Sequence, residues 1–158
     1  MSRILKSWLP VVCWMGLIFI VSTDLGSANH TSRIIEPLLR WLNPDVSTGT
    51  IELAQTIIRK GGHLTEYAIL ALLTLRAINL SRQNHEGKQA AGYFRSAVIA
   101  LLIAAAYAAT DEFHQSFIPS RTPSIYDVLI DTAGAFVALI AATLWKKSRG
   151  KPAAVTPN

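Results

Sequence analysis

The sequence predicts an all-α protein: an integral membrane bundle of four transmembrane helices. Of its 158 residues, 51% are hydrophobic and only 16% are charged, against about 25% charged residues in soluble domains. Four separate stretches approach the roughly 20 mostly apolar residues that a helix needs to cross a bilayer. The chain length is typical of a single domain.

The four predicted spans cover residues 8–22, 63–80, 96–113 and 125–145. The first reads WLPVVCWMGLIFIVS, and the third has AVIALLIAAAYAA as its apolar body. We place one transmembrane domain at residues 1–147. The final segment, residues 148–158, contains GKPAAVTPN, which has no apolar period, so we expect a disordered cytoplasmic tail there.

The first span could instead be a signal peptide, because Arg3 and Lys6 precede its apolar run. No A-x-A cleavage site follows, and Val12 stands before Cys13 where a lipoprotein signal has a small residue. We therefore expect this segment to remain as a span. Cys13 is the only cysteine, which excludes an internal disulfide, and we expect it to be a small buried hydrophobe.

The basic residues predict how the chain is oriented. Ten of the 15 Lys and Arg residues lie before the first span, in the last part of the second span or between it and the third, or after the last span. Basic residues near span ends favour the cytoplasmic side. The net charge of +5 is therefore interpreted as a topology signal and not as a nucleic-acid-binding surface. We predict a multi-pass protein of the bacterial cytoplasmic (inner) membrane with both termini in the cytoplasm.

The first extracytoplasmic connection is too long for a plain loop. Within it, SRIIEPLLRWL and TGTIELAQTIIRK each gather apolar residues on one side, which predicts two short amphipathic helices at the membrane surface. Pro37 is expected in the first turn of the first helix, and Asn43–Pro44–Asp45 is expected to form the turn between them. Alternatively, both helices only cap the bundle. The polar segment 81–94 predicts a cytoplasmic linker in which His85 and Glu86 are solvated.

The acidic residues of the spans fall near one depth. Counted from the cytoplasmic charges at about 1.5 Å per helical residue, Asp24, Glu66, Asp111 and Asp131 lie roughly 22–27 Å away. This depth corresponds to the outer boundary of the membrane, so the polar groups of all four spans are expected at the same level.

Helical spacing assigns these polar residues to faces. The predicted groups are His63, Glu66 and Tyr67 on the second span, Tyr107, Asp111, His114 and Gln115 on the third, and Asp127, Asp131, Gly134 and Ala138 on the fourth. Ionisable groups at membrane depth usually face the bundle interior or a wet cavity, and small residues allow close helix contact. We expect an outward-open polar cup walled by the second, third and fourth spans. The alternative is a polar network that only locks the packing of the helices.

The short loop before the fourth span contains one cation, Arg121. Its guanidinium is placed to pair with the carboxylates or to bind an anionic group such as a phosphate. The alternative is an internal salt bridge to Asp127 or Asp111.

Two patterns in the chain carry a family resemblance. K-x-x-H-x-x-E-Y-x-x-L runs from Lys60 to Leu70, and D-E-x-x-Q-x-F-x-P-x-R-x-x-x-x-x-D-V runs from Asp111 to Val128. Together they resemble the VanZ-like family over about residues 8–145. The sequence departs from the family at Asp131, because D-x-x-G stands where the family usually shows Asn-x-x-Gly.

The resemblance implies a small multi-spanning membrane protein. The founding member of the family is linked to resistance against teicoplanin, a lipid-tailed glycopeptide that acts at the outer face of the membrane. The family name brings no established reaction and no cofactor, so it implies a location and a site. An antibiotic-resistance role for this chain does not follow from it.

The first interpretation of the cup is an enzyme acting on a membrane lipid or lipid-linked envelope molecule. His63 or Glu66 would be the general base, and a carboxyl group of Asp111 or Glu112 would be the acid. Closely spaced carboxyl groups acquire different pKa values, so that one can donate a proton while another accepts one. The substrate head group would be held by the remaining polar residues of the cup, which are Tyr67, Gln115, Arg121, Asp127 and Asp131.

Two other interpretations use the same residues. A non-catalytic protein would bind or flip a lipid or glycopeptide head group. A metal-dependent enzyme would use the i, i+3 pairs His63–Glu66 and Asp111–His114 as ligands, as helical bundles do. Independently of these interpretations, we expect His63 to face Asp111 or Glu112 across the contact of the second and third spans, where it could carry a proton between substrate and acid. The alternative is a neutral His63 at the start of the second span.

Overall fold

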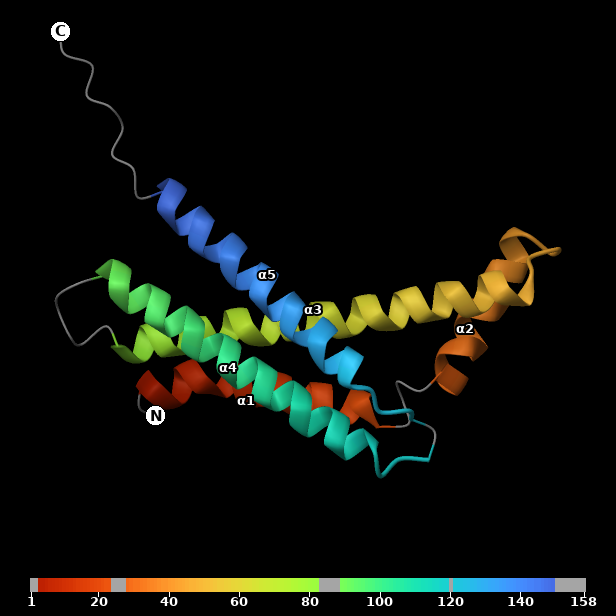
Figure 1. Ribbon diagram of the computed structural model, residues 1–158, viewed down its shortest axis with the longest axis horizontal. Coiled ribbons are helices and arrows are strands. Elements are labelled where there is room, and N and C mark those ends of the chain that lie inside the picture. The colour runs from red at the N-terminus through yellow and green to blue at the C-terminus, as the bar shows by residue number, and fades with distance from the viewer. Residues whose placement is uncertain (1–2, 24–27, 83–88, 120, 150–158) are drawn as a thin grey trace, which may run out of the picture.

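Helices are the only regular secondary structure in the described part of the chain, as predicted. The computed structural model describes residues 3–23, 28–82, 89–119 and 121–149. Within these ranges there are five helices and no strand: α1 (Arg3–Ser22), α2 (Ala28–Leu42), α3 (Thr48–Arg82), α4 (Gln89–Gln115) and α5 (Ile125–Arg149) (Figure 1).

Four of the helices, α1, α3, α4 and α5, are long and apolar enough to cross a membrane. They contain the four predicted spans, and each extends beyond the predicted segment, because an established helix readily continues into polar flanking residues. The last helix reaches Arg149, so the start of the predicted tail is helical. Residues 150–158, together with Asp24, His85 and Glu86, lie outside the described residues.

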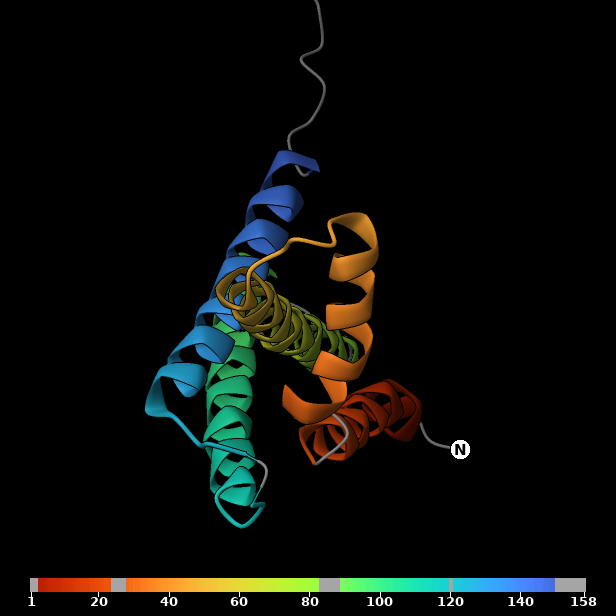
Figure 2. The ribbon, with the colours of Figure 1, turned by 90° about the vertical axis from the view of Figure 1, so that its right-hand side faces the viewer.

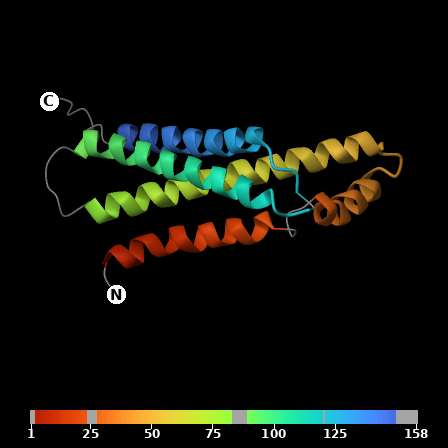
Figure 3. The ribbon, with the colours of Figure 1, turned by 60° about the horizontal axis from the view of Figure 1, so that its bottom comes forward.

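The second predicted amphipathic helix is not a separate element. Residues 48–60 are the beginning of α3, which continues without a break through Gly61 and Gly62 to Arg82. Its 35 residues correspond to about 52 Å of helix, whereas the hydrocarbon core is about 30 Å thick. The N-terminal part of α3 therefore projects beyond the bundle, as Figures 1 and 3 show.

The first predicted amphipathic helix is α2, which packs beside this projecting part of α3. Ser32 Oγ donates to Gln55 Oε1 at 3.2 Å across the contact, while Ile34 and Trp41 remain exposed. Pro37 does not lie in the first turn, because α2 begins earlier than predicted. Pro37 lies inside the helix, where it has no N–H to donate to the preceding turn.

Helix α3 is the centre of the bundle and contacts each of the other four helices. Figures 2 and 3 show α1, α4 and α5 around its C-terminal part. Two indoles attach α1 to α3: Trp8 Nε1 donates to Ser81 Oγ at 3.2 Å, and Trp14 Nε1 donates to the carbonyl oxygen of Glu66 at 2.9 Å. Cys13, between them, faces outward and is exposed. The expectation of a buried thiol was therefore wrong, since in a membrane the outer surface of a span is itself apolar.

Small residues allow the helices to approach closely. Ala100, Ala104 and Ala108 form a fully buried row on α4, with the four-residue spacing of one helical face. On α5, Gly134 lies against the backbone of α3. A Cβ atom at Gly134 would collide with the carbonyl oxygen of Leu64 and lie 3.0 Å from its carbonyl carbon. The predicted close contact at Gly134 is confirmed.

Replacing Gly134 with alanine should therefore destabilise the bundle. Inserting a methyl group against a backbone forces the two helices apart, and overpacking of this kind typically costs about 1–3 kcal/mol. We expect a lower midpoint of thermal unfolding for detergent-purified Gly134→Ala than for wild type. The control is Gly61→Ala, where an added Cβ meets nothing within 4 Å and helix propensity favours alanine. Equal stability of Gly134→Ala and wild type would contradict the close crossing.

The orientation of the bundle remains a prediction from the basic residues. In a Cys13→Ser background, a single cysteine at Asp45, an exposed residue of the turn between α2 and α3, should react with an impermeant maleimide in intact cells. A single cysteine at Lys147, at the opposite end, should react only after permeabilisation. Labelling of position 147 in intact cells would reverse the proposed orientation.

Candidate functional site

His63 and Asp131 form an ion pair across the contact of α3 and α5. Nδ1 of His63 lies 3.5 Å from Oδ1 of Asp131, and the Asp131 residue is completely buried. Gly134 lies one turn beyond Asp131, and Leu64 directly follows His63, so the close backbone contact brings the pair together. The predicted pairing of His63 with Asp111 or Glu112 is therefore wrong, since its carboxylate partner comes from α5.

Asp111 and Gln115 attach the end of α4 to the end of α1. Oδ2 of Asp111 accepts hydrogen bonds from Ser22 Oγ at 2.7 Å and from Gln115 Nε2 at 3.0 Å. Gln115 Nε2 also lies 2.8 Å from Ser22 Oγ. All three residues are buried. The first span thus joins the site through Ser22, a residue that we did not predict. The sequence did contain a signal for it, because Ser22 lies two residues before Asp24 and therefore near the depth estimated for the other polar residues.

Glu112 fastens the start of α5. Its Oε2 accepts a hydrogen bond from the backbone N–H of Ser124 at 2.7 Å, while Ser124 Oγ accepts one from the N–H of Tyr126 at 3.2 Å. Ser124 is therefore the N-cap of α5. In a capping box, an acidic or amide side chain three residues later bonds the N-cap amide. Here a carboxylate from another helix makes that bond, a contact that the local sequence does not indicate.

Asp127, predicted to bind substrate, is paired with a residue of α3. Nζ of Lys60 lies 2.8 Å from Asp127 Oδ1, and their side chains are 40% and 18% exposed. Lys60 opens the motif that carries the family resemblance, but we had given it no role. The ion pair holds the beginning of α5 against α3.

The guanidinium of Arg121 lies against the last turn of α1. Its Nε and Nη2 atoms donate to the carbonyl oxygens of Ser22 and Val21, each at 3.1 Å. A cation there complements the negative end of the helix dipole. Neither Asp127 nor Asp111 forms the predicted salt bridge with it. Burial lowers the pKa of Arg121, and the nearby charge of Arg59 lowers it further, while the surrounding carboxylates oppose the change.

Tyr67 and Glu66 lie between these contacts. Tyr67 is completely buried, and its ring centroid lies 6.3 Å from that of Tyr107. Glu66 is partly buried and interacts electrostatically with His63, Asp111 and Asp131. We call the group His63, Glu66, Tyr67, Asp111, Glu112 and Asp131 the polar cluster.

The polar cluster is more enclosed than the predicted cup. Asp131, Asp111 and Glu112 are only 0%, 4% and 6% exposed. Partial exposure is confined to His63 and Glu66 within the cluster.

The residues proposed as metal ligands do not form a ligand set. The ring of His114 stacks on Phe19 of α1, with centroids 4.3 Å apart. Within the described ranges, no three side chains of His, Cys, Asp and Glu are arranged to hold a metal ion. His63, Glu66 and Asp111 belong to the polar cluster and His114 lies beside it, but the four side chains do not form the ligand set that the i, i+3 pairs suggested.

The comparison with protein families identifies the chain. The model of the family described as VanZ/LLP1 matches residues 7–146, which cover all of α3 and α4, most of α1 and α5, and the whole polar cluster. The chain belongs to the VanZ/LLP1 family. No curated protein and no solved structure matches it.

In this VanZ/LLP1 protein, part of the polar cluster is buried without hydrogen-bond partners. The atoms concerned are His63 Nδ1, Tyr67 Oη, Asp111 Oδ1, Glu112 Oε1, both carboxylate oxygens of Asp131 and, beside the cluster, His114 Nε2. Two of them, His63 Nδ1 and Asp131 Oδ1, face each other at 3.5 Å in the ion pair, a distance too long for a hydrogen bond of good geometry. Buried polar groups in native proteins are rarely unpaired, and each exception calls for an explanation. Asp111 and Glu112 each use one carboxylate oxygen to fix a helix end, which leaves the other available.

Crosslinking can test the partner of His63 in the VanZ/LLP1 bundle. In a Cys13→Ser background, cysteines replacing His63 and Asp131 should be joined by a short bifunctional reagent. A pair replacing His63 and Asp111 should react much less, because the contact runs from α3 to α5. The reverse preference would restore the α3–α4 pairing.

Proposed function

We propose that this VanZ/LLP1 protein acts on the polar head group of a membrane amphiphile by acid–base chemistry at the polar cluster. The observation that carries the proposal is the burial of polar atoms without hydrogen bonds in a cluster whose imidazole, that of His63, is paired with the carboxylate of Asp131. Locking helices together requires satisfied polar groups, since an unsatisfied one costs free energy. The unpaired atoms favour a role in recognition or proton transfer.

The His63–Asp131 pair has the arrangement of a general base and its orienting group. A carboxylate at Nδ1 fixes the ring and its tautomer, and ring geometry then directs Nε2 away from Asp131. Nε2 can accept a proton from a substrate hydroxyl or amine and return it later in the reaction. Glu66, one turn further along the same face of α3, is a second proton-carrying group beside His63.

The unpaired atoms indicate the chemistry of the head group. Four of the seven belong to carboxylates, and carboxylate oxygens accept hydrogen bonds. Arg121, the expected anion-binding residue, is bonded to carbonyl oxygens of α1. A head group rich in donors, such as a sugar hydroxyl or an amine, complements this set better than a phosphate does. The amphiphiles of the bacterial envelope include such head groups.

A second candidate function is binding or flipping of the same head group without chemistry. It is favoured by the bonds that tie Asp111 and Glu112 to helix ends, because residues that build the frame are poorly suited to shuttle protons. The two functions differ in what they require of Glu66 and Asp131. Binding needs the shape and polarity of these side chains, whereas acid–base chemistry needs their titratable groups.

The isosteric variants Glu66→Gln and Asp131→Asn separate the two functions. We expect membranes from cells that express the wild type to contain a modified amphiphile that empty-vector cells lack, detected by mass spectrometry of total lipid extracts. Each variant should lower that product by about 100-fold or more, the usual contribution of a general acid or base. The unmodified amphiphile should still copurify with the variant protein.

The control is Asp45→Asn, which changes an exposed carboxylate in the turn between α2 and α3 and should leave the product unchanged. Immunoblots of membranes normalise each variant for accumulation. An amphiphile that copurifies with wild type while no product depends on the wild type would overturn the catalytic proposal in favour of binding. Failure of the variants to accumulate, with no ligand on the wild type, would favour a purely structural network.

A further inference from the structure

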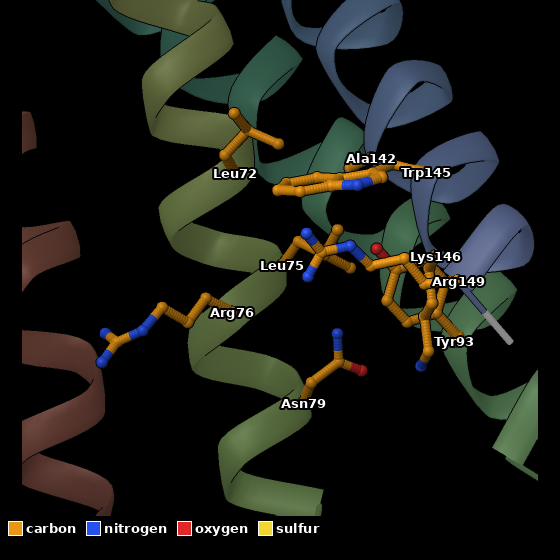
Figure 4. A pocket seen from close by; sticks show the side chains of 9 residues that line it. All are labelled: Leu72, Leu75, Arg76, Asn79, Tyr93, Ala142, Trp145, Lys146 and Arg149. Carbon is orange, nitrogen blue, oxygen red and sulfur yellow. The ribbon is translucent and has the colours of Figure 1, made fainter.

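A second feature lies at the opposite end of the bundle from the polar cluster. Between the C-terminal parts of α3 and α5 and the beginning of α4 there is a cleft of about 340 Å³, a size typical of small ligand sites. Figure 4 shows the side chains that line it, which are Leu72, Leu75, Arg76, Asn79, Tyr93, Ala142, Trp145, Lys146 and Arg149.

Among the described residues, the charges at this end are of one sign. Within the described ranges, no Asp or Glu lies on α1, on α3 after Tyr67, on α4 before Asp111 or on α5 after Asp131. The described carboxylates all lie toward the other end of the bundle, on α2, on the projecting part of α3 or in the turn between these two helices. Lys146 and Arg149 have no carboxylate partner among the described residues. The cleft is therefore in a positive field that nothing described there neutralises.

Aromatic rings hold the two cations at the cleft. Nζ of Lys146 lies 4.0 Å from the centroid of the Tyr93 ring, and the guanidinium carbon of Arg149 lies 4.7 Å from that of Trp145. Figure 4 shows Arg149 reaching beneath the indole toward Leu75, with the amide of Asn79 directed toward the same space, whereas the guanidinium of Arg76 points away. Stacking on a ring restrains a long side chain and leaves its N–H groups free to donate.

The wall of the cleft is apolar. Leu72, Leu75 and Ala142 line it together with the indole of Trp145. The cleft has cations at its rim and apolar side chains along its wall. It therefore matches an amphiphilic ligand with an anionic head group and an acyl chain. Inorganic phosphate would use the rim alone.

We propose that this cleft binds an anionic phospholipid such as phosphatidylglycerol. The lipid phosphate lies at Arg149 and Lys146 and accepts a further hydrogen bond from Asn79, while an acyl chain follows Leu72, Leu75 and Trp145. Arginine binds phosphate oxygens through two parallel N–H groups, and basic pockets between transmembrane helices bind phosphate head groups. The site is separate from the polar cluster, whose acceptor-rich chemistry favours a different head group.

Native mass spectrometry of the purified full chain in a neutral detergent can test this site. Phosphatidylglycerol should bind with one saturable stoichiometry, and phosphatidylcholine of the same acyl composition should bind at least about fivefold more weakly. Millimolar inorganic phosphate should not displace the bound lipid. Equal binding of the two lipids would overturn the proposal, and so would displacement by phosphate alone, which would indicate a phosphate site.

Variants distinguish specific binding of the lipid in the cleft from nonspecific electrostatic attraction to the basic end of the bundle. Lys146→Gln and Arg149→Gln should each weaken phosphatidylglycerol binding about fivefold, and Ala142→Phe should abolish it by filling the wall while every charge is kept. The control, Lys147→Gln, removes an exposed neighbouring cation that does not line the cleft, and should have little effect. The proposal fails if Lys147→Gln weakens binding as much as Arg149→Gln, or if Ala142→Phe binds normally while retaining the wild-type unfolding midpoint.

Discussion

The contact of Gly134 with the backbone of Leu64 is the constraint on which the polar cluster depends. Only a residue without a Cβ atom fits there, and the resulting approach of α5 to α3 places Asp131 beside His63. A wider crossing would leave the carboxylate of Asp131 buried and far from any cation, which is a costly state in hydrocarbon. The small residue therefore has an electrostatic consequence as well as a packing one.

Four contacts around this crossing fix the ends of the helices. Glu112 bonds the N-cap of α5, Lys60 pairs with Asp127, Asp111 bonds Ser22, and Arg121 bonds the last carbonyls of α1. Charged groups thus act where helices leave unpaired backbone groups or meet one another. Their arrangement explains how one bundle end can contain so many ionisable residues. Several of them fix helix ends, while Asp111 and Glu112 each keep one carboxylate oxygen without a hydrogen bond.

The sequence predicted the class of fold because apolar length and helical period are local properties. It also predicted the close contact at Gly134, since a small residue one turn from a buried carboxylate is visible in the pattern. The partner of His63 could not be predicted in the same way. Depth places Asp111, Glu112 and Asp131 at one level, and only the rotation of each helix about its axis decides among them. The roles of Ser22, Ser124 and Lys60 could not be predicted for the same reason, because each of these residues makes its contact with a different helix. The continuation of α3 through Gly61 and Gly62 was missed because glycines weaken a helix without ending it.

The two ends of the bundle are chemically opposite, and this division bears on how an amphiphile would be handled. At one end, buried carboxylate oxygens without hydrogen bonds lie in the same cluster as an imidazole; at the other, stacked cations border an apolar cleft. A phosphate head group is repelled by the first and attracted by the second, so an anionic lipid would occupy the basic end without competing for the polar cluster. With the orientation that the basic residues predict, the anionic lipid would anchor the cytoplasmic end of α5. Asp131 and Lys146 lie on the same continuous helix, α5, so the polar cluster and the proposed lipid site share this one element.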